Sequence, residues 1–373
     1  MKWLFWGSVG IITYTYAGYA GWLWLRRRWR YRPVKASPFT PPLSIVVVVR
    51  NEAEVLDRKL RNLTELNYPV ELRRIIVVSD GSADCTNEIL SQWSKRSEIH
   101  FILHPDSQGK AAGLNDAIRA ATGEIVVFTD ARQRIEPDAI RLLAENFADP
   151  EVGCASGELM LGDPESGENV KGMGLYWRIE KVVRELESAS GSVVGATGAL
   201  YAVRRNLLAA IPPETVLDDV YIPMNVIRQG ARVIFDPRAR AWDVPNLGAS
   251  REFARKVRTL SGNYQLVQLA PWLLSGSNPL RFEFVSHKLL RLVVPFALTA
   301  TLVTTVFLKQ PIYKIALALQ VGFYAMSLLA IGQFSRGPLA RIADAAFTFV
   351  VLNTAAAVAF ANFVTGKKAV WIR

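Results

Sequence analysis

The sequence is poor in the residues that build disulfide and zinc scaffolds. Its 373 residues include two cysteines, Cys85 and Cys154, and three histidines. Two cysteines are too few for a disulfide framework, and no Cys/His cluster has the spacing of a zinc site. We expect both cysteines to behave as buried small hydrophobic residues, in a chain that meets a reducing compartment on at least one side.

The composition excludes a disordered or fibrous chain and leaves an excess of positive charge to explain. Half of the residues are hydrophobic, and 44 basic residues against 33 acidic ones give a net charge of +11. Such an excess is typical of proteins that meet nucleic acid, anionic lipid or phosphorylated substrates. Because the basic residues cluster beside apolar runs and no face of the expected sheet combines aromatic and basic residues, we expect no nucleic-acid partner.

An uncharged run at the amino end is long enough to cross a membrane. Trp3 to Leu25 contains 23 residues without a charge, and a cluster of arginines from Arg26 to Arg32 follows it. Basic residues beside a span favour the cytoplasmic side, so the domain that follows is expected in the cytoplasm. A cleavable signal peptide is the alternative, but its basic residues would precede the apolar run.

Three further apolar stretches, at 289–308, 315–331 and 345–364, predict a total of four spans. We therefore expect a multi-pass protein of the cell (inner) membrane with a cytoplasmic catalytic domain and membrane lipids as partners. The expected organisation is an anchor with its basic flank at 1–32, an α/β domain at 43–250, an interface region at 251–286 and a membrane region at 287–373.

Between the membrane segments, short β-branched runs alternate with stretches of helical periodicity. Strands are predicted at Leu43 to Val49, Arg74 to Ser79, Ile99 to Leu103 and Glu124 to Thr129. The first is apolar on both faces, as a central strand covered by helices on both sides should be. The fold class predicted is α/β, with a doubly wound and largely parallel sheet.

Acidic residues follow three of these strands, namely Glu52, Asp80 and Asp130. In open α/β sheets the ligand lies beyond the carboxyl ends of the strands. Clustered carboxylates repel one another, so such a group usually persists where a divalent cation or a polar ligand neutralises it. For Asp80 alone, a helix cap explains the residue equally well.

The order of these motifs resembles that of family 2 glycosyltransferases with the GT-A fold. The whole chain looks like their membrane-embedded bacterial members, related to the cellulose, hyaluronan and poly-N-acetylglucosamine synthases. The resemblance covers residues 43–265 and is specific as a series of segments: VRNE at 49–52, SDGS at 79–82, GKAAGLN at 109–115, FTDAR at 128–132, ATGALYAVRR at 196–205 and VLDDV at 216–220.

The resemblance implies a nucleotide-sugar donor whose base and ribose are held by Glu52 and Asp80, with Lys110 facing the donor. Thr197 and Gly198 would line the acceptor site. The alternatives are a solvated lysine at a helix start for Lys110, and a buried strand with a glycine for close packing at 197–198.

Asp130 occupies the metal-binding Asp-x-Asp position, where Mg²⁺ or Mn²⁺ would bind with the diphosphate. Here the sequence departs from the family pattern, because Arg132 replaces the second carboxylate. Either Asp130 coordinates the metal together with water and phosphate, or the guanidinium of Arg132 takes over part of the diphosphate charge.

Asp218 and Asp219 match the family's paired-acid motif, whose second acid is the general base of inverting enzymes. A sugar hydroxyl is a poor nucleophile, and a carboxylate within hydrogen-bond reach can take its proton as the new bond forms. The resemblance therefore assigns Asp219 as the base and Asp218 as the residue that orients the loop. A double acid at the start of a helix is the alternative.

The last motif is the weakest. Processive members carry Gln-x-x-Arg-Trp on an interfacial helix, whereas the matching residues here are Arg255 to Thr259. Arg251, Arg255 and Arg258 still fall on one helical stripe, and Arg255 and Arg258 would face the diphosphate. The missing tryptophan, which would stack on an acceptor sugar, argues against long-chain processivity.

We therefore expect a membrane-bound inverting glycosyltransferase that moves a sugar, from a UDP-sugar, to a hydroxyl of a lipid-linked or growing polysaccharide in cell-envelope glycan synthesis. One alternative is a synthase that adds a single sugar to a glycolipid or a polyprenyl phosphate. The alternative from another class is a non-catalytic, nucleotide-sensing membrane scaffold.

Overall fold

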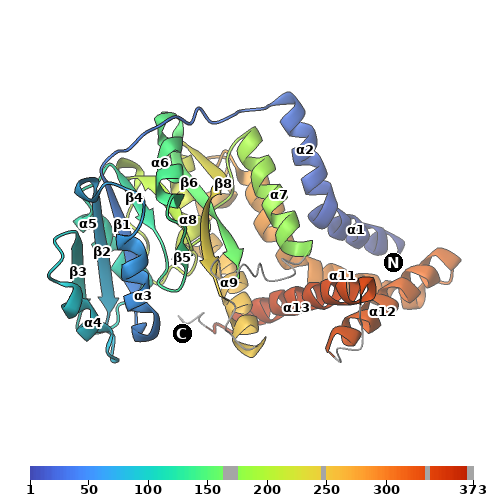
Figure 1. Cartoon of the computed structure of the whole chain (residues 1–373). Coiled ribbons are helices and arrows are strands. Elements are labelled where there is room, and N and C mark those ends of the chain that lie inside the picture. Colours follow the sequence, from blue (N-terminus) through green and yellow to red (C-terminus); the bar gives the residue numbers. More distant parts are fainter. Residues whose placement is uncertain (163–174, 245–248, 332–336, 368–373) are drawn as a thin grey trace.

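The computed structural model describes residues 1–162, 175–244, 249–331 and 337–367. Figure 1 shows an α/β domain on one side and a group of long helices on the other. The two amino-terminal helices contact both groups.

One sheet of eight strands, in the order β3-β2-β1-β4-β7-β6-β8-β5, forms the centre of the α/β domain. Its first half is parallel, as predicted from the β-branched runs, and comprises β1 (Leu43–Val49), β2 (Arg73–Asp80), β3 (Ile99–His104) and β4 (Ile125–Phe128). The carboxyl ends of these strands therefore lie along one edge.

The second half of the sheet is mixed. β7 (Tyr201–Arg204) runs antiparallel to β4 and to β6 (Val152–Leu161), and β8 (Arg232–Asp243) runs parallel to β6. The short strand β5 (Arg134–Ile135) pairs antiparallel with β8. The expected doubly wound α/β sheet is confirmed, with antiparallel pairs confined to this half.

Helices cover both faces of the sheet because the strands are apolar on both faces. Alternate β1 residues, such as Ile45 and Val46, belong to two separate cores. The first core contains residues of α3 (Ala53–Thr64), α4 (Thr86–Trp93) and α6 (Ala139–Glu145), and the second contains residues of α5 (Lys110–Ala120) and α8 (Asp218–Arg228).

The two cysteines have different environments. Cys154 on β6 is buried in the second core, as predicted, but Cys85 is exposed. The prediction for Cys85 was wrong because this residue precedes α4 in a surface turn rather than lying on its apolar face.

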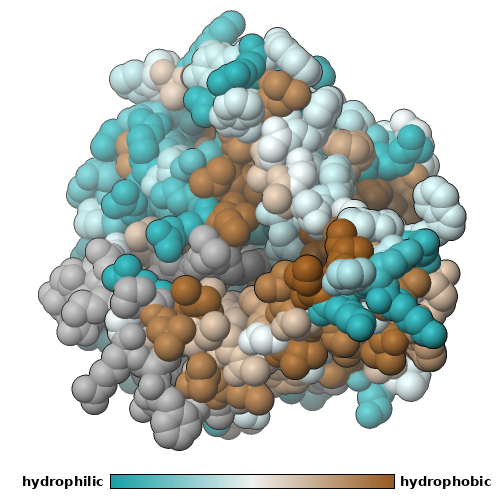
Figure 2. All heavy atoms as spheres, turned by 90° about the vertical axis from the view of Figure 1, so that its right-hand side faces the viewer, coloured by the Kyte–Doolittle hydropathy of each residue, from teal (hydrophilic) through white to brown (hydrophobic). Residues whose placement is uncertain are grey.

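Three helices among the described residues are long and apolar enough to cross a membrane: Arg281–Phe307, Pro311–Ala330 and Leu339–Val364. They correspond to the three predicted carboxyl-terminal stretches. The first joins α10 (Arg281–Phe284), η6 (Val285–Leu289) and α11 (Leu290–Phe307), and the other two lie within α12 (Pro311–Ile331) and α13 (Pro338–Val364). Figure 2 shows hydrophobic side chains gathered on the lower part of the molecule, below a more hydrophilic upper part.

The expected amino-terminal span is helical but is not among these three. It consists of α1 (Lys2–Thr13), a π-helical turn η1 (Tyr14–Gly18) and α2 (Tyr19–Trp29). α1 and α2 run in different directions (Figure 1). α1 packs on α11, and α2 packs on α7 (Leu175–Ser190). That this segment crosses the bilayer stays a prediction.

The helix α9 (Ala249–Leu269) connects the two parts of the chain. It follows the sheet in sequence and packs along α13. The sequence predicted an interfacial helix here, and α9 does lie where the α/β domain meets the apolar helices (Figure 1).

Candidate active site

A cavity of 2940 Å³ opens beyond the carboxyl ends of the parallel strands and extends between the apolar helices. Most of the side chains proposed from the sequence line it: Glu52, Lys110, Asp130, Arg132, Thr197, Gly198, Asp218, Asp219, Arg255 and Arg258. Six segments that are far apart in the chain therefore meet at one site.

The turn after β1 presents Glu52 to this cavity. Asn51 adopts a positive φ of 51°, and its side-chain oxygen accepts a hydrogen bond from the Ala83 backbone N–H at 2.5 Å. The backbone N–H of Glu52 donates to Thr86 Oγ1 at 3.0 Å. The turns after β1 and β2 thus hold each other, which fixes the position of Glu52.

Asp80 is not among the residues that line the cavity, and its direct contact with the nucleotide stays a prediction. It is fully buried, and its carboxylate accepts hydrogen bonds from Ser107 Oγ at 2.7 Å and from the backbone N–H groups of Gln108 and Gly109 at 2.7 and 3.0 Å. Burial raises the pKa of Asp80, but these hydrogen bonds and one with His104 outweigh it and hold the pKa below its ordinary value. Asp80 therefore orders the loop that leads to Lys110.

Lys110 is the first residue of α5 and links two of the predicted acids. Its Nζ lies 3.1 Å from Asp130 Oδ1 and 3.1 Å from Asp218 Oδ1. Burial lowers the pKa of Lys110, but the charges of Asp130, Asp218 and Asp219 outweigh burial and raise it. The alternative of a solvated surface lysine is excluded, because Lys110 is the cation that holds this acidic cluster together.

The loop that carries Asp130 is bound by Lys59, a residue that the sequence analysis missed. Lys59 on α3 is 2% exposed, and its Nζ donates to Thr129 Oγ1 at 2.9 Å and to the Gln133 backbone carbonyl at 2.8 Å. Burial lowers the pKa of Lys59 to about 7. The one signal in the sequence was a lysine on the apolar face of a predicted helix.

Asp219 has the electrostatic environment of a base that works near neutral pH. It lies in the first turn of α8 without capping that helix through its side chain, and its own backbone carbonyl accepts from the Ala196 N–H at 2.7 Å. Burial and the neighbouring charge of Asp218 raise the pKa of Asp219 to about 6, against the opposing charges of Lys110 and Lys288. Both acids lie in the first turn of α8, as the alternative expects, but no hydrogen bond from a helix N–H to either side chain caps the helix among the residues that the structure describes.

Gly198 lies between Asp130 and Asp219. A Cβ atom at this position would be 3.5 Å from Asp219 Oδ2 and 3.6 Å from Asp130 Oδ2. The neighbouring Thr197 is held by a hydrogen bond from its N–H to Ser156 Oγ at 3.0 Å. The two carboxylates therefore face a common space at the segment that was expected to line the acceptor site.

Arg132 and Arg255 converge on Asp243, a second residue that the sequence analysis missed. Arg132 NH2 lies 3.0 Å from Asp243 Oδ2, and Arg255 NH1 lies 3.6 Å from the same oxygen. Asp243 is buried at the end of β8 and lines the cavity. Its position at a strand end was the available signal. Both arginines remain at the cavity wall, in reach of an anionic ligand.

The residues present suit a divalent cation that is shared with phosphate oxygens. Within the described residues, no three His, Cys, Asp or Glu side chains form a complete protein cage for a metal. Asp130, with 42% of its side chain exposed, offers carboxylate oxygen to the cavity. Mg²⁺ in nucleotide sites typically takes only one or two carboxylates and completes its shell with phosphates and water. One aspartate at this position meets that requirement.

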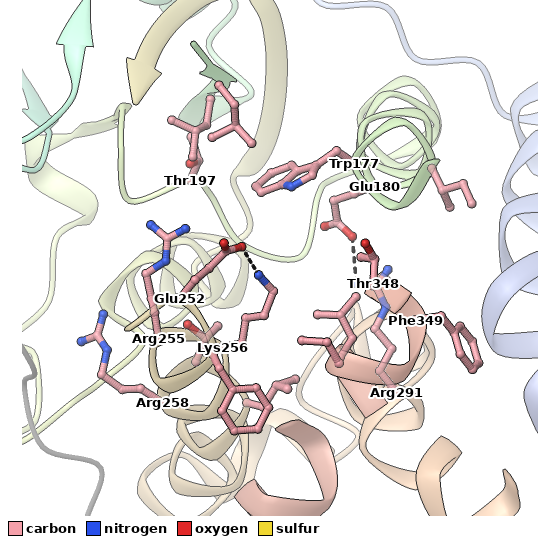
Figure 3. A pocket seen from close by; sticks show the side chains of 18 of the residues that line it. Trp177, Glu180, Thr197, Glu252, Arg255, Lys256, Arg258, Arg291, Thr348 and Phe349 are labelled. Atoms are coloured by element: carbon pink, nitrogen blue, oxygen red, sulfur yellow. Dashed lines mark hydrogen bonds and ion pairs between the residues drawn. The ribbon is translucent and has the colours of Figure 1, made fainter. Parts of the chain in front are cut away.

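The wall toward the apolar helices carries a buried network that no sequence motif indicated. His287 lies between two acids of α7, with Nε2 at 3.1 Å from Glu180 and Nδ1 at 2.8 Å from Glu187. Arg291 NH1 lies 2.8 Å from Glu180 Oε2, and the Tyr19 hydroxyl donates to Glu187 at 2.6 Å. Figure 3 shows Glu180 and Arg291 across the cavity from Arg255 and Arg258 of α9.

Comparisons with known proteins agree with this geometry. Residues 44–211 match the family model described as "Glycosyl transferase family 2". The chain is 22% identical over 229 residues to the poly-beta-1,6-N-acetyl-D-glucosamine synthase of Staphylococcus aureus, which covers 60% of this chain and 55% of that protein. It is 23% identical over 234 residues to the synthase of the same name from Staphylococcus epidermidis, covering 62% of this chain and 56% of that protein. The chain thus spans about half the length of the curated relatives it matches.

A solved structure, a mannosyltransferase from Pyrobaculum calidifontis in complex with GDP-Man and Mn²⁺, matches with a TM-score of 0.74 and 23% identity, covering 98% of this chain and 99% of that one. This match shows the fold, which is GT-A. Residues 44–211 are thus similar to family 2 glycosyltransferases, and the described residues include apolar helices of membrane-spanning length.

Proposed function

We propose that this protein is a glycosyltransferase that moves a sugar, with inversion, from a nucleoside diphosphate donor to a hydroxyl of a lipid-linked or growing glycan. A UDP-sugar is the donor we favour, and the proposed role is cell-envelope polysaccharide synthesis. The observation that carries the proposal is the meeting of Lys110, Asp130 and Asp219 at one cavity, with the pKa of Asp219 raised to about 6.

In the proposed reaction, Asp219 accepts the proton of the acceptor hydroxyl while the hydroxyl oxygen attacks the anomeric carbon of the donor sugar. The bond from that carbon to the donor phosphate breaks, and the nucleoside diphosphate leaves with the electron pair. A base with a pKa near the working pH is suited to this proton transfer. Asp218 is held by Lys110, so the proton goes to its neighbour Asp219.

Negative charge collects on the departing diphosphate, and fixed cations around it lower the barrier. Lys110 already lies at 3.1 Å from Asp130, and Arg132 and Arg255 lie on the wall beside it. Asp130 would hold a Mg²⁺ or Mn²⁺ ion, which would supply further neutralisation of the diphosphate when bound. Glu52 contacts the nucleoside in this proposal, and Asp80 supports it by ordering residues 107–109.

The test is transfer activity of Asp219→Asn on purified protein with a panel of labelled nucleotide sugars. We expect transfer to fall by about 100-fold or more, the usual contribution of a general base, while donor binding persists. Asp138→Asn, which changes an exposed aspartate outside the cavity, serves as the matched control. Undiminished transfer by Asp219→Asn would remove the base from the mechanism.

A second candidate is the addition of a single sugar to a lipid. The continuation of the cavity between apolar helices favours it, as does threonine at position 259, where processive relatives of this pattern carry tryptophan. Separating labelled product into single-sugar lipid and polymer decides between the two candidates.

We also propose that the α/β domain faces the cytoplasm, where nucleotide sugars are available. The cluster of arginines from Arg26 to Arg32 at the end of α2 supports this orientation through the positive-inside rule. Labelling of the exposed Cys85 by a membrane-impermeant thiol reagent only after cells are opened is the expected result.

A further inference from the structure

The cavity is too large for a donor alone. Pockets for small ligands and cofactors usually measure about 300–1,000 Å³, whereas this one measures 2940 Å³. Its lining divides into a polar end at the strand termini and an apolar end between the helices. The apolar end accounts for the additional volume and requires an occupant of its own.

All three membrane-length helices and η1 contribute to the apolar end. Its lining residues include Tyr16 of η1, Leu298 and Thr301 of α11, Ala316, Leu319 and Phe323 of α12, and Phe349 and Leu352 of α13. A space between helices at membrane depth that is lined mainly by hydrocarbon excludes water and accepts apolar chains.

Two polar side chains of this end, Gln320 and Thr301, are bonded within the helices, whereas Arg341, Asp344 and Thr348 also line the cavity. Gln320 Nε2 donates to the Leu298 backbone carbonyl and to the Tyr324 hydroxyl, both at 2.9 Å. The Thr301 hydroxyl donates to the Ala297 carbonyl at 2.5 Å. The hydrocarbon majority of this lining, rather than a lack of hydrogen-bonding groups, favours a hydrocarbon occupant over a saccharide.

Positive side chains without partners lie where the apolar end meets the catalytic end. In the described part of the chain, Lys288 and Arg258 line the cavity and make no ion pair or hydrogen bond. Lys288 is close enough to Asp219 for its charge to act on that carboxylate. Figure 3 shows Arg258 on the α9 wall, opposite Arg291. Half-buried cations that form no ion pair favour an anionic ligand, and phosphate is suited to both.

We propose that the acceptor is a phosphate-bearing lipid whose hydrocarbon chain occupies the apolar end and whose phosphate lies against Lys288 and Arg258. A hydroxyl of the lipid's head group then reaches Asp219, which takes its proton while the hydroxyl oxygen bonds to the anomeric carbon and the nucleoside diphosphate leaves. This inference rests on the proposed function for the identity of the reaction, but the binding site itself can be tested without any turnover.

The binding test uses the full chain in detergent and a hexadecyl phosphate that carries a photoreactive diazirine near the end of its chain. We expect labelling on cavity residues of α12 and α13, and we expect Ala316→Trp to reduce it by about tenfold. The matched control is Ala318→Trp, because Ala318 is exposed on the same helix and does not line the cavity. Equal labelling of both variants, or labelling only of outward-facing residues, means general contact with lipid and overturns the inference.

The phosphate contact is tested with Lys288→Gln, and with Lys314→Gln as control, since Lys314 is an exposed cation of α12 outside the cavity. We expect the first variant to weaken labelling by hexadecyl phosphate about tenfold and to leave labelling by the matching hexadecanol unchanged. Competition by inorganic phosphate as strong as that by unlabelled hexadecyl phosphate would indicate a free-phosphate site and would overturn the role of the chain.

The two proposals fail in different ways. We expect Ala316→Trp to keep Asp219-dependent hydrolysis of the donor by water while it loses transfer to lipid by at least about tenfold. Normal transfer to lipid in Ala316→Trp overturns the lipid site alone. Absence of any Asp219-dependent donor turnover in the unmodified protein overturns the proposed function. The labelling experiments would then still test the lipid-binding site, because they do not depend on turnover.

Discussion

The catalytic end and the membrane end of the cavity are built in different ways. At the catalytic end, several of the candidate side chains follow a strand or lie in the first turn of a helix, as Glu52, Lys110 and Asp219 do. At the membrane end, Tyr19, Glu187 and His287 are brought together only by packing of α2, α7 and η6. The first kind of site leaves a motif in the sequence, whereas the second leaves only polar residues on apolar helices.

The two ends also differ in the role of their charged side chains. Lys110 holds two acids that stay accessible from the cavity. Glu187, by contrast, is fully buried among its partners. Substitutions at the catalytic end should therefore reduce activity, whereas those in the buried network of Tyr19, Glu187 and His287 should reduce stability.

The largest expected effect is that of Lys110→Met. Removing the cation leaves Asp130 and Asp218 unpaired and takes positive charge away from the diphosphate, so we expect kcat/KM to fall by about 100-fold or more. Lys95→Met, at an exposed lysine beyond α4, is the control. A loss below threefold in a variant that elutes normally from size-exclusion chromatography would contradict the assignment.

The pH dependence of transfer comes next. Because the pKa of Asp219 is about 6, the base is mostly deprotonated at pH 7, and activity should fall by about tenfold between pH 7 and pH 5. The measurement is kcat against pH at saturating donor. A flat profile over this range would show that proton transfer to Asp219 does not limit the rate.

A smaller effect is expected for Asp243→Asn, which removes the carboxylate shared by Arg132 and Arg255. With both guanidinium groups less well oriented, the KM for the donor should rise by about three- to tenfold, with little change in kcat. Asp236→Asn is the control, because Asp236 lies on the same strand and pairs with Arg238 outside the cavity. Equal effects of both variants would make the role of Asp243 structural.

The smallest effect on activity is expected for Tyr19→Phe, at the membrane end. It removes the hydroxyl that donates to Glu187 at 2.6 Å, and a hydrogen bond to a charged group contributes about 1.5–3 kcal/mol. We expect a lower Tm in detergent with activity within twofold of the unmodified chain. Tyr31→Phe, at an exposed tyrosine, should change neither quantity. A large loss of activity without a change in Tm would remove the distinction between the two ends.

Sequence reasoning reached the parallel half of the sheet and most of the catalytic end for one physical reason. Buried strands read as apolar runs, and the residue after each run is placed at the sheet edge by its own strand. It did not anticipate that the Asp80 carboxylate bonds to the loop before α5, because a strand end specifies the position of a side chain but not its direction. Lys59, Asp243 and Glu180 were missed because their partners come from distant elements.

Gly198 has a consequence that concerns evolution of the site rather than its assembly. An added methyl group there would meet neighbouring atoms only at ordinary contact distances, so the chain should tolerate alanine as it folds. In the proposed reaction, that methyl would nevertheless occupy the space between Asp130 and Asp219, where the donor and the acceptor meet. Gly198→Ala is thus expected to leave a folded but inactive protein, and a screen for loss of stability would not detect the importance of this position.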